Sequence, residues 1–458
     1  MEKKLSTIGI LHFIVGGTDG VSLEINKWKR VLEDIGHTVH LCAGDLGTLN
    51  GTMVEELYHH RPDIERINVN TFIALDDFES EAAYRTELER IASLIEEKVG
   101  AFLNEKDIDF FIPQNVWANS VSPPATLAIA RLIRKRKIPS LAHHHDFYWE
   151  RIDGVALTSA TAIELADKCM PPREDFIQHV VINSLAREEL MARKGIPSTV
   201  VPNVFDFSGE GWHKDGYNQD LRGRIGLSEN DILILQATRI VPKKGIELAI
   251  DLVAELNKSH RCAKFSQSGL FDGRPFTDDS KIVLVLPGIT ADEITGTYVK
   301  KLKEKIERSG IEAHFIEGLV DGSRREEKGE KVYSLWDTYV AADFVTYPSQ
   351  WEGWGNQFLE AVHARLPMMI FEYPVYQADI KEVGFNVISL GSETAGFDNL
   401  GLVQVDPSII NRAADQAMEL LINPVHRDEV VTLNYGLGTR YFSLEALQEH
   451  LMPLVGVV

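Results

Sequence analysis

Short apolar runs alternate with longer amphipathic stretches along most of the chain. This alternation is typical of strand–helix–strand units on a parallel sheet, because a strand covered on both faces is apolar throughout. The expected strands cover residues 8–15, 38–42, 109–112, 139–143, 179–182, 232–238, 282–286, 312–316, 343–347 and 368–371. The expected helices cover 21–35, 81–104, 124–137, 186–194, 245–258, 291–309, 333–342 and 356–365. The pattern predicts an α/β fold.

The alternation breaks near the middle of the chain. Residues 206–230 are rich in Gly and Asp and have no clear period, which is typical of a linker, here with a short helix. We therefore expect two doubly wound, Rossmann-like domains, over 1–205 and 231–439. The charge run RREEKGEK at 324–331 is expected to be a solvated loop. Because open α/β sheets bind ligands at the carboxyl ends of their strands, we expect the domains to face a central cleft there.

Composition excludes several classes of protein. The 47 Lys and Arg against 68 Asp and Glu give a net charge of −21, which argues against sequence-independent binding to nucleic acid. The cysteines Cys42, Cys169 and Cys262 form no C-x-x-C pair, so we expect a reducing cytoplasm and no zinc ribbon. The sequence contains no run of 18 apolar residues, so no membrane span is expected. The apolar run at 8–15 fits a first strand better than a signal peptide.

Cationic and glycine-rich loops follow two of the expected strands. Gly16 and Gly17 stand between the first strand and its helix, where backbone N–H groups can meet an anion, although a tight turn explains them equally well. Arg239 and Lys244 flank a Pro turn after the strand at 232–238, with Lys243 as an adjacent candidate for the same role. Two such cations could neutralise a diphosphate leaving group.

Two glutamates follow the strand at 343–347, in the run YPSQWEGWGNQFLEA. Glu352 lies in a Gly-rich loop and Glu360 about one turn into the next helix, so their carboxylates could accept hydrogen bonds from the hydroxyl groups of two sugars. The residues between them, from Gly355 to Phe358, offer backbone N–H groups at a helix N-terminus, which suits a phosphate.

Three consecutive histidines follow the strand at 139–143. Neighbours in an extended chain point to opposite faces, so His143, His144 and His145 are not expected to close on one metal ion. Asn115 and Asn119 follow another strand at the same edge, where their amides could bind the hydroxyl groups of a ligand or cap the loop.

The run from Tyr347 to Ala361 resembles the E-x7-E motif of the retaining glycosyltransferases of family 4, which have the GT-B fold. Trp354 departs from the family, which usually has Phe there. Leu286-Pro287-Gly288 resembles the loop that lies along the nucleotide base. The resemblance covers most of the chain and is strongest over 232–371. It implies an acceptor-binding first domain, a second domain that binds a nucleotide sugar, and a C-terminal helix over 440–458 that packs back on the first.

The residues and the resemblance together give a set of site residues. The catalytic candidates are His145, the best fit of the three histidines with His144 second, and Arg239, Lys244 and Glu352. Those expected at the donor are Gly16, Gly17, Pro287, Gly288, Gly355, Asn356, Gln357, Phe358 and, at the ribose, Glu360. Those expected at the acceptor are Asp19, Asn115, Asn119, His144, Tyr148 and Arg151.

The resemblance implies transfer of a hexose with retention, and UDP-glucose and GDP-mannose are the leading donors. The net acidity favours a small soluble acceptor such as a sugar, a sugar phosphate or a glycerate-type solute, as in sucrose-type and mannosylglucosylglycerate-type synthases. No cofactor is expected, and a divalent metal ion is possible but not implied, because Arg and Lys can supply its charge. A glycoside phosphorylase, a sugar-nucleotide epimerase and a non-catalytic nucleotide-sugar binder remain alternatives. The oligomeric state stays open, a homo-oligomer included.

Overall fold

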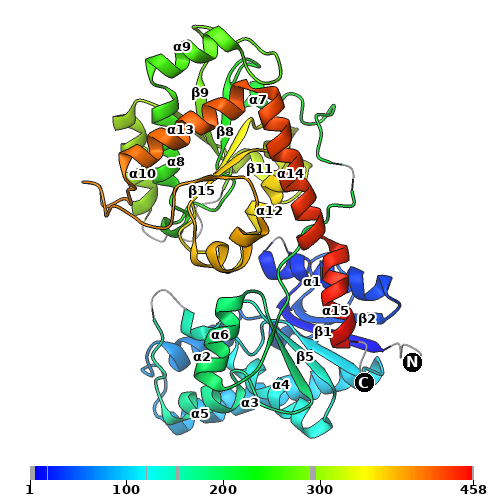
Figure 1. Cartoon of the computed structure of the whole chain (residues 1–458). Helices are drawn as coiled ribbons and strands as arrows, with labels where there is room; N and C mark the ends of the chain where they lie inside the picture. Colours follow the sequence, from blue (N-terminus) through cyan, green and yellow to red (C-terminus); the bar gives the residue numbers. More distant parts are fainter. Residues whose placement is uncertain are drawn as a thin grey trace. The chain divides into compact units, whose positions relative to one another are not determined.

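The chain folds into two compact units, Met1–Val204 with Leu444–Val458, and Phe205–Ser443 (Figure 1). The computed structural model describes residues 6–17, 19–119, 121–150, 154–209, 211–288, 296–327 and 329–455. Each unit is built on its own parallel sheet with helices on both faces. The predicted fold class, two doubly wound Rossmann-like α/β domains, is confirmed.

The sheet of the first unit has the strand order β3-β2-β1-β4-β5-β6-β7, and all neighbours are parallel. Its strands are β1 (Thr7–Ile14), β2 (Thr38–Asp45), β3 (Thr52–Met53), β4 (Phe110–Pro113), β5 (Ser140–His144), β6 (Ile177–Val181) and β7 (Thr199–Val200). The order reverses between β1 and β4, and ligands of such sheets bind at the carboxyl ends of the strands beside this switch point.

Two layers of helices cover this sheet. The helices α1 (Gly20–Asp34) and α15 (Leu444–Val455) share one core, in which Trp28, Leu447 and Leu451 are fully buried. The opposite core contains residues of α2 (Pro62–Phe72), α3 (Glu81–Glu105), α4 (Pro123–Arg136) and α5 (Ala160–Cys169). A further helix, α6 (Ser184–Lys194), contacts β6 and β7.

The sheet of the second unit has the order β10-β9-β8-β14-β15-β16 and is also parallel. Its strands are β8 (Ile232–Leu235), β9 (Ile282–Leu286), β10 (Glu312–Phe315), β14 (Phe344–Tyr347), β15 (Met368–Ile370) and β16 (Ile388–Ser389). Val345 pairs with Leu235, and Leu235 pairs with Val285. The three central strands therefore end at the same edge, which brings the loops with Arg239, Pro287 and Glu352 there.

Helices cover both faces of this second sheet. One core contains residues of α8 (Ile246–Leu256), α10 (Thr297–Ser309) and α13 (Pro407–Ile422). The helices α11 (Leu335–Ala341) and α12 (Asn356–His363) contact β8 and β14. Three more helices are α7 (Leu221–Arg224), α9 (Ser259–Ser268) and α14 (Pro424–Phe442), the last of which packs on α12.

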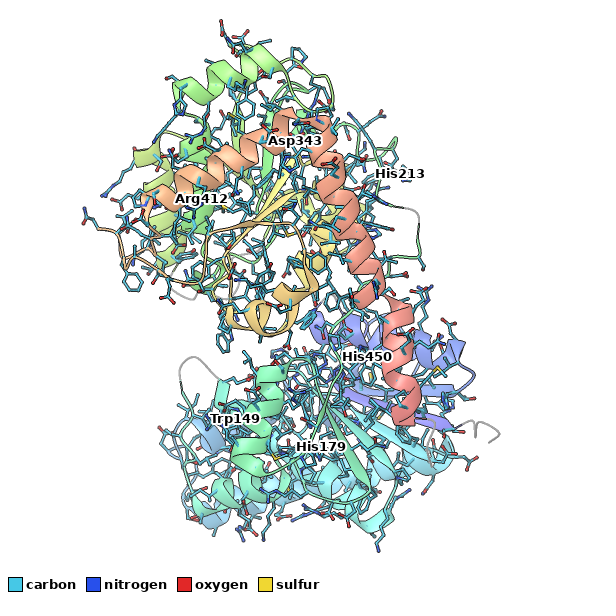
Figure 2. The ribbon with its side chains drawn as sticks, in the orientation of Figure 1. Trp149, His179, His213, Asp343, Arg412 and His450 are labelled. Carbon is cyan, nitrogen blue, oxygen red and sulfur yellow. The ribbon has the colours of Figure 1, made fainter. Side chains whose placement is uncertain are left out.

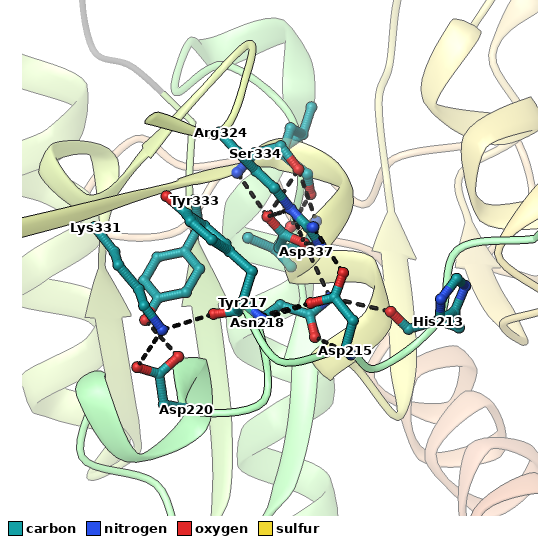
Figure 3. Close-up of polar contacts among 12 residues, drawn as sticks. His213, Asp215, Tyr217, Asn218, Asp220, Arg324, Lys331, Tyr333, Ser334 and Asp337 are labelled. Carbon is teal, nitrogen blue, oxygen red and sulfur yellow. Dashed lines mark hydrogen bonds and ion pairs between the residues drawn. The ribbon is translucent and has the colours of Figure 1, made fainter. Parts of the chain in front are cut away.

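The segment expected as a linker differs from the expectation, because residues 206–230 lie within the second unit. Figure 3 shows part of the reason: Arg324 forms ion pairs with both Asp215 and Asp337. Lys331 pairs with Asp220, whose other oxygen accepts from the Tyr333 hydroxyl at 2.9 Å. These contacts join Asp215 and Asp220 to residues 324–337, which follow β10.

The charge run at 324–331 was wrongly predicted to be a loop. It contains β12 (Arg325–Glu327) and the start of β13 (Glu330–Ser334), an antiparallel pair that β11 (Val320–Asp321) extends. Arg325 pairs with Asp321, and Arg224 pairs with Glu330. The charges on these strands have ionic partners on neighbouring segments, so a polar run forms a hairpin here.

Candidate functional site

The loops after β8 and β14 meet at the carboxyl edge of the second sheet. Lys244 Nζ donates to Glu352 Oε1, and the two side chains are only 5% and 11% exposed. The backbone reinforces this contact, since Gln350 N donates to Lys243 O at 2.8 Å. Gly245 adopts φ +59°, and a Cβ there would lie 2.4 Å from Pro348 O, so the two loops require glycine at this point. The structure thus brings together two of the predicted catalytic side chains.

Glu360 lies on α12 and is 4% exposed. Its Oε2 accepts a hydrogen bond from the hydroxyl of Tyr339, on α11, at 2.7 Å. Burial, and then the nearby Glu360 carboxylate, raise the pKa of Tyr339 well above its usual value, so its hydroxyl stays protonated as a donor. The second glutamate of the pair therefore has a fixed orientation in the fold.

A crowded turn precedes α12. Gly355 has φ +117°, and a Cβ there would lie 2.2 Å from the Tyr373 hydroxyl, which itself donates to Trp354 O at 2.9 Å. Burial, and then Glu352, raise the pKa of Tyr373 well above its usual value. Only glycine fits this backbone, and α12 begins directly after it with Asn356 and Gln357.

Two of the predicted donor residues have structural partners instead of free groups. The backbone N–H of Phe358 donates to Gly355 O at 3.0 Å. This N–H therefore already has an acceptor, whereas the prediction was that it would bind a phosphate. A Cβ on Gly288 would lie 1.9 Å from Thr238 O, so Gly288 lets the loop after β9 touch the loop after β8. Pro287 is buried in that same loop, whereas Arg239 is exposed after β8.

The three histidines take different directions at the carboxyl edge of the first sheet. His144 Nε2 lies 3.0 Å from Nδ1 of His179 on β6, and Figure 2 labels His179 in this unit. His143 stacks on the Trp28 ring at 4.2 Å on the other side of the sheet. The His145 ring lies 4.3 Å from the His143 ring, and its backbone N–H donates to Asn115 Oδ1 at 3.0 Å.

Burial makes these imidazoles neutral near pH 7. It lowers the pKa of His145 to about 3, with a smaller contribution from His12, whose own pKa burial lowers to about 4. His12 Nδ1 lies 2.7 Å from Gln114 O, which makes that nitrogen the donor. The side chains at this edge can therefore exchange hydrogen bonds with hydroxyl groups without adding positive charge.

Most of the predicted acceptor residues also have structural partners. Asp19 caps α1 by accepting from Val21 N and Ser22 N, and Asn119 Oδ1 accepts from Val121 N at 3.3 Å. Asn115 adopts φ +55° and donates to Asp146 at 2.8 Å. The Tyr148 ring stacks on Phe72, and Arg151 lies outside the described residues.

The glycines after β1 are explained by the turn itself. Gly16 adopts φ +76°, and a Cβ there would lie 2.7 Å from Leu46 O. A Cβ on Gly17 would lie 3.0 Å from the Asp19 carboxylate. A tight turn against residues 46–49 therefore accounts for both positions, and their part in donor binding stays a prediction.

Three further polar groups lie near these edges, and only Gln114 belongs to a run whose amides the sequence marked. Gln114 is fully buried at the end of β4, and its side-chain nitrogen and oxygen find no partner among the described residues. Burial raises the pKa of Glu150 to about 7, although Phe147 N donates to it. The position after a buried strand marked Gln114 beforehand, but no local pattern marked Tyr339, which reaches Glu360 from another helix.

The described residues contain no group of three His, Cys, Asp or Glu side chains arranged to hold a metal ion. The three cysteines are free thiols, and burial raises the pKa of Cys42 to about 12. Among the described helices, none has both the length and the apolar character needed to cross a bilayer.

Comparisons with known proteins agree with this architecture. The family described as glycosyl transferases group 1 matches residues 218–382. Mannosylglucosylglycerate synthase of Petrotoga mobilis is 39% identical over 94% of this chain and 97% of its own, and that of Thermotoga maritima is 38% identical over 96% and 98%. A glycosyltransferase structure from Rickettsia africae superposes with a TM-score of 0.60 at 12% identity, covering 98% of each chain, and supports the fold alone.

The match at the family level includes the loops that carry Arg239, Lys244 and Glu352, and the helix that carries Glu360. The two relatives match far beyond that region, over almost the whole of both chains. The predicted family is therefore confirmed: the chain belongs to the glycosyl transferases group 1, and it is a glycosyltransferase of the GT-B fold.

Proposed function

We propose that this glycosyltransferase moves a mannosyl group from a nucleotide sugar, with GDP-mannose as the leading donor, to glucosylglycerate. The contact between Lys244 and Glu352, beside the helix that carries Glu360, is the structural observation that carries the donor side of this proposal. It gathers a cation and carboxylates from two loops at one sheet edge. UDP-glucose, which would transfer a glucosyl group instead of a mannosyl group, is the second donor to test.

The donor would bind at the carboxyl edge of the second sheet. Glu360 would accept hydrogen bonds from the ribose hydroxyls, and Glu352 from hydroxyls of the transferred sugar. Lys244 and the exposed Arg239 would bind the diphosphate, with help from the amides at the start of α12. A bound diphosphate would compete with Glu352 for the Lys244 ammonium, so donor binding would loosen this ion pair.

The names of the two relatives support the choice of acceptor. Both are called mannosylglucosylglycerate synthase, and removing the mannosyl group from that product leaves glucosylglycerate. The acceptor would bind at the carboxyl edge of the first sheet. His145 would hydrogen-bond near the reacting centre as a neutral imidazole, because burial lowers its pKa to about 3. This small anionic acceptor fits the glycerate-type solute expected from the sequence.

Transfer would proceed with retention at the anomeric carbon. The acceptor hydroxyl would form the new C–O bond on the face from which the diphosphate leaves, and a phosphate oxygen of that leaving group would take the hydroxyl proton. Arg239 and Lys244 would stabilise the negative charge that develops on the departing diphosphate. No metal ion or cofactor is required in this scheme.

A binding screen followed by a transfer assay tests the proposal. We expect one nucleoside diphosphate among UDP, GDP and ADP to raise the melting temperature, since a ligand at 100 times its Kd stabilises by about 2.7 kcal/mol. Arg239→Ala should weaken that stabilisation. The matching nucleotide sugar should then glycosylate glucosylglycerate. A chain that binds no nucleotide but cleaves a glycoside with inorganic phosphate would overturn the proposal in favour of a phosphorylase.

A further inference from the structure

We propose that Tyr339 is a positioning residue for the donor site, which holds the Glu360 carboxylate in the orientation that binds the nucleotide ribose. The inference rests on the proposed function, in which Glu360 is the ribose ligand. It assigns a role to a side chain that lies on a different helix, 21 positions before Glu360 in the sequence.

The contact is direct and buried. The Tyr339 hydroxyl donates to Glu360 Oε2 at 2.7 Å, and the two residues are 1% and 4% exposed. A hydrogen bond to a charged acceptor is roughly twice as strong as one between neutral groups. A glutamate side chain has three torsions. A hydrogen bond to one carboxylate oxygen limits the rotamers that the side chain can adopt, and so fixes the position of the second oxygen. The bond therefore pre-organises the group that would meet the ligand.

Aromatic packing holds the Tyr339 ring. The Trp212 ring centroid lies 5.4 Å from it, and Trp212 stacks on Trp336 at 4.6 Å with an interplanar angle of 18°. His363, on the same helix as Glu360, packs edge-on against Trp212 at 4.7 Å. Trp212 thus packs on the Tyr339 ring and is itself held by Trp336 of α11 and His363 of α12.

The helix that carries Tyr339 is itself anchored at its start. Ser334 and Asp337 form a reciprocal capping box at the N-terminus of α11. Asp337 also accepts from Arg324 and from Asn218, at 3.0 Å for the latter (Figure 3). A chain of contacts therefore runs from the hairpin and residues 213–220 through α11 to Tyr339 and Glu360. Several buried polar groups therefore fix the position of this helix.

Tyr339→Phe tests the inference, because it removes the hydroxyl and leaves the ring. We expect the Kd for the stabilising nucleoside diphosphate and the KM for its sugar donor to rise about tenfold, with kcat within about twofold. Tyr333→Phe is the matched control, since it removes another hydrogen bond from a buried tyrosine to a carboxylate, Asp220, in the same unit. The control should leave the Kd and KM unchanged.

A double-mutant cycle separates positioning from a general structural effect. If Tyr339 acts through Glu360, Tyr339→Phe should add nothing to the loss of nucleotide affinity in Glu360→Ala. Additive losses would overturn the inference, and so would wild-type affinity in Tyr339→Phe alongside weakened binding in Glu360→Ala. If Glu360→Ala itself binds nucleotide like the wild type, the proposed role of Glu360 fails instead, and the positioning role fails with it.

Discussion

The Lys244 ammonium donates to the Glu352 carboxylate, joining the loops that follow β8 and β14. These residues are 108 positions apart in the sequence, and the neighbouring parallel strands bring them to one edge. Both side chains are largely buried, so neither charge is well solvated without the other. In the proposed function, this pair would keep a cation at the donor site when no diphosphate is there to balance it.

Removing the cation should damage both folding and activity. We expect Lys244→Met to lower the free energy of unfolding by about 3 kcal/mol, because it leaves a buried carboxylate unpaired. Transfer should fall by at least 100-fold. Lys243→Met is the matched control, since Lys243 is the more exposed neighbour and should leave both nearly unchanged. Urea unfolding and initial rates measure the two effects. Equal losses in both variants would contradict the assignment to Lys244.

The turn before α12 should tolerate no side chain at Gly355. Gly355→Ala places a Cβ 2.2 Å from the Tyr373 hydroxyl at φ +117°, so we expect about 3 kcal/mol of destabilisation and a large loss of donor affinity. Gly310→Ala is the control, because it has φ +64° and no atom within 4 Å. It should cost about 1 kcal/mol. Adding Tyr373→Phe to Gly355→Ala should restore part of the stability, and the absence of any rescue would argue against the clash.

The buried histidines should make stability depend on pH. Burial lowers the pKa of His12 to about 4, so between pH 6.5 and 4 the unfolded chain binds a proton that the folded chain does not. Stability therefore falls as the pH is lowered through this window, by up to about 1.4 kcal/mol per pH unit for each such histidine. His12→Asn should flatten the slope of unfolding free energy between pH 5 and 6.5. The exposed control His260→Asn should not, and identical slopes for all three proteins would contradict the prediction.

Chelation should leave the transfer rate unchanged. In the proposed reaction, Arg239 and Lys244 supply the positive charge that a divalent ion would otherwise bring to the diphosphate. We expect equal initial rates with and without EDTA after dialysis, and no activation by added Mg²⁺ or Mn²⁺. Loss of activity with EDTA that Mn²⁺ restores would show that the two cations are not sufficient.

Much of the candidate site at the second sheet could be predicted from the sequence, because its residues follow strands. Lys244 and Glu352 each come within ten residues of a buried apolar run, and the topology of a parallel sheet places such loops at one edge. The side of the sheet on which each of the three histidine rings lies was harder to predict. Alternation along β5 separates His144 from His143 and His145, but only the observed contacts with His179 and Trp28 show which side each ring occupies.

Features that depend on tertiary partners could not be read locally. Tyr339 is of interest only because it hydrogen-bonds Glu360, which lies on another helix. The run at 324–331 forms a hairpin because segments elsewhere supply opposite charges. The helix α14 was also missed. It contains Gly436 and Gly438, which weaken helix propensity, yet Gly438 lets the helix lie against Phe207 and Val362. Packing overrides local preference at each of these places.

The central claim is retaining transfer from a nucleotide sugar to a glycerate-type acceptor. The most direct test incubates the purified chain with GDP-mannose or UDP-glucose and glucosylglycerate, and follows the product by NMR at its new anomeric carbon. We expect one donor to give a product with the anomeric configuration of that donor, and Glu352→Gln to abolish its formation. An inverted product, or no transfer from any nucleotide sugar by a folded protein that binds nucleotide, would contradict the claim.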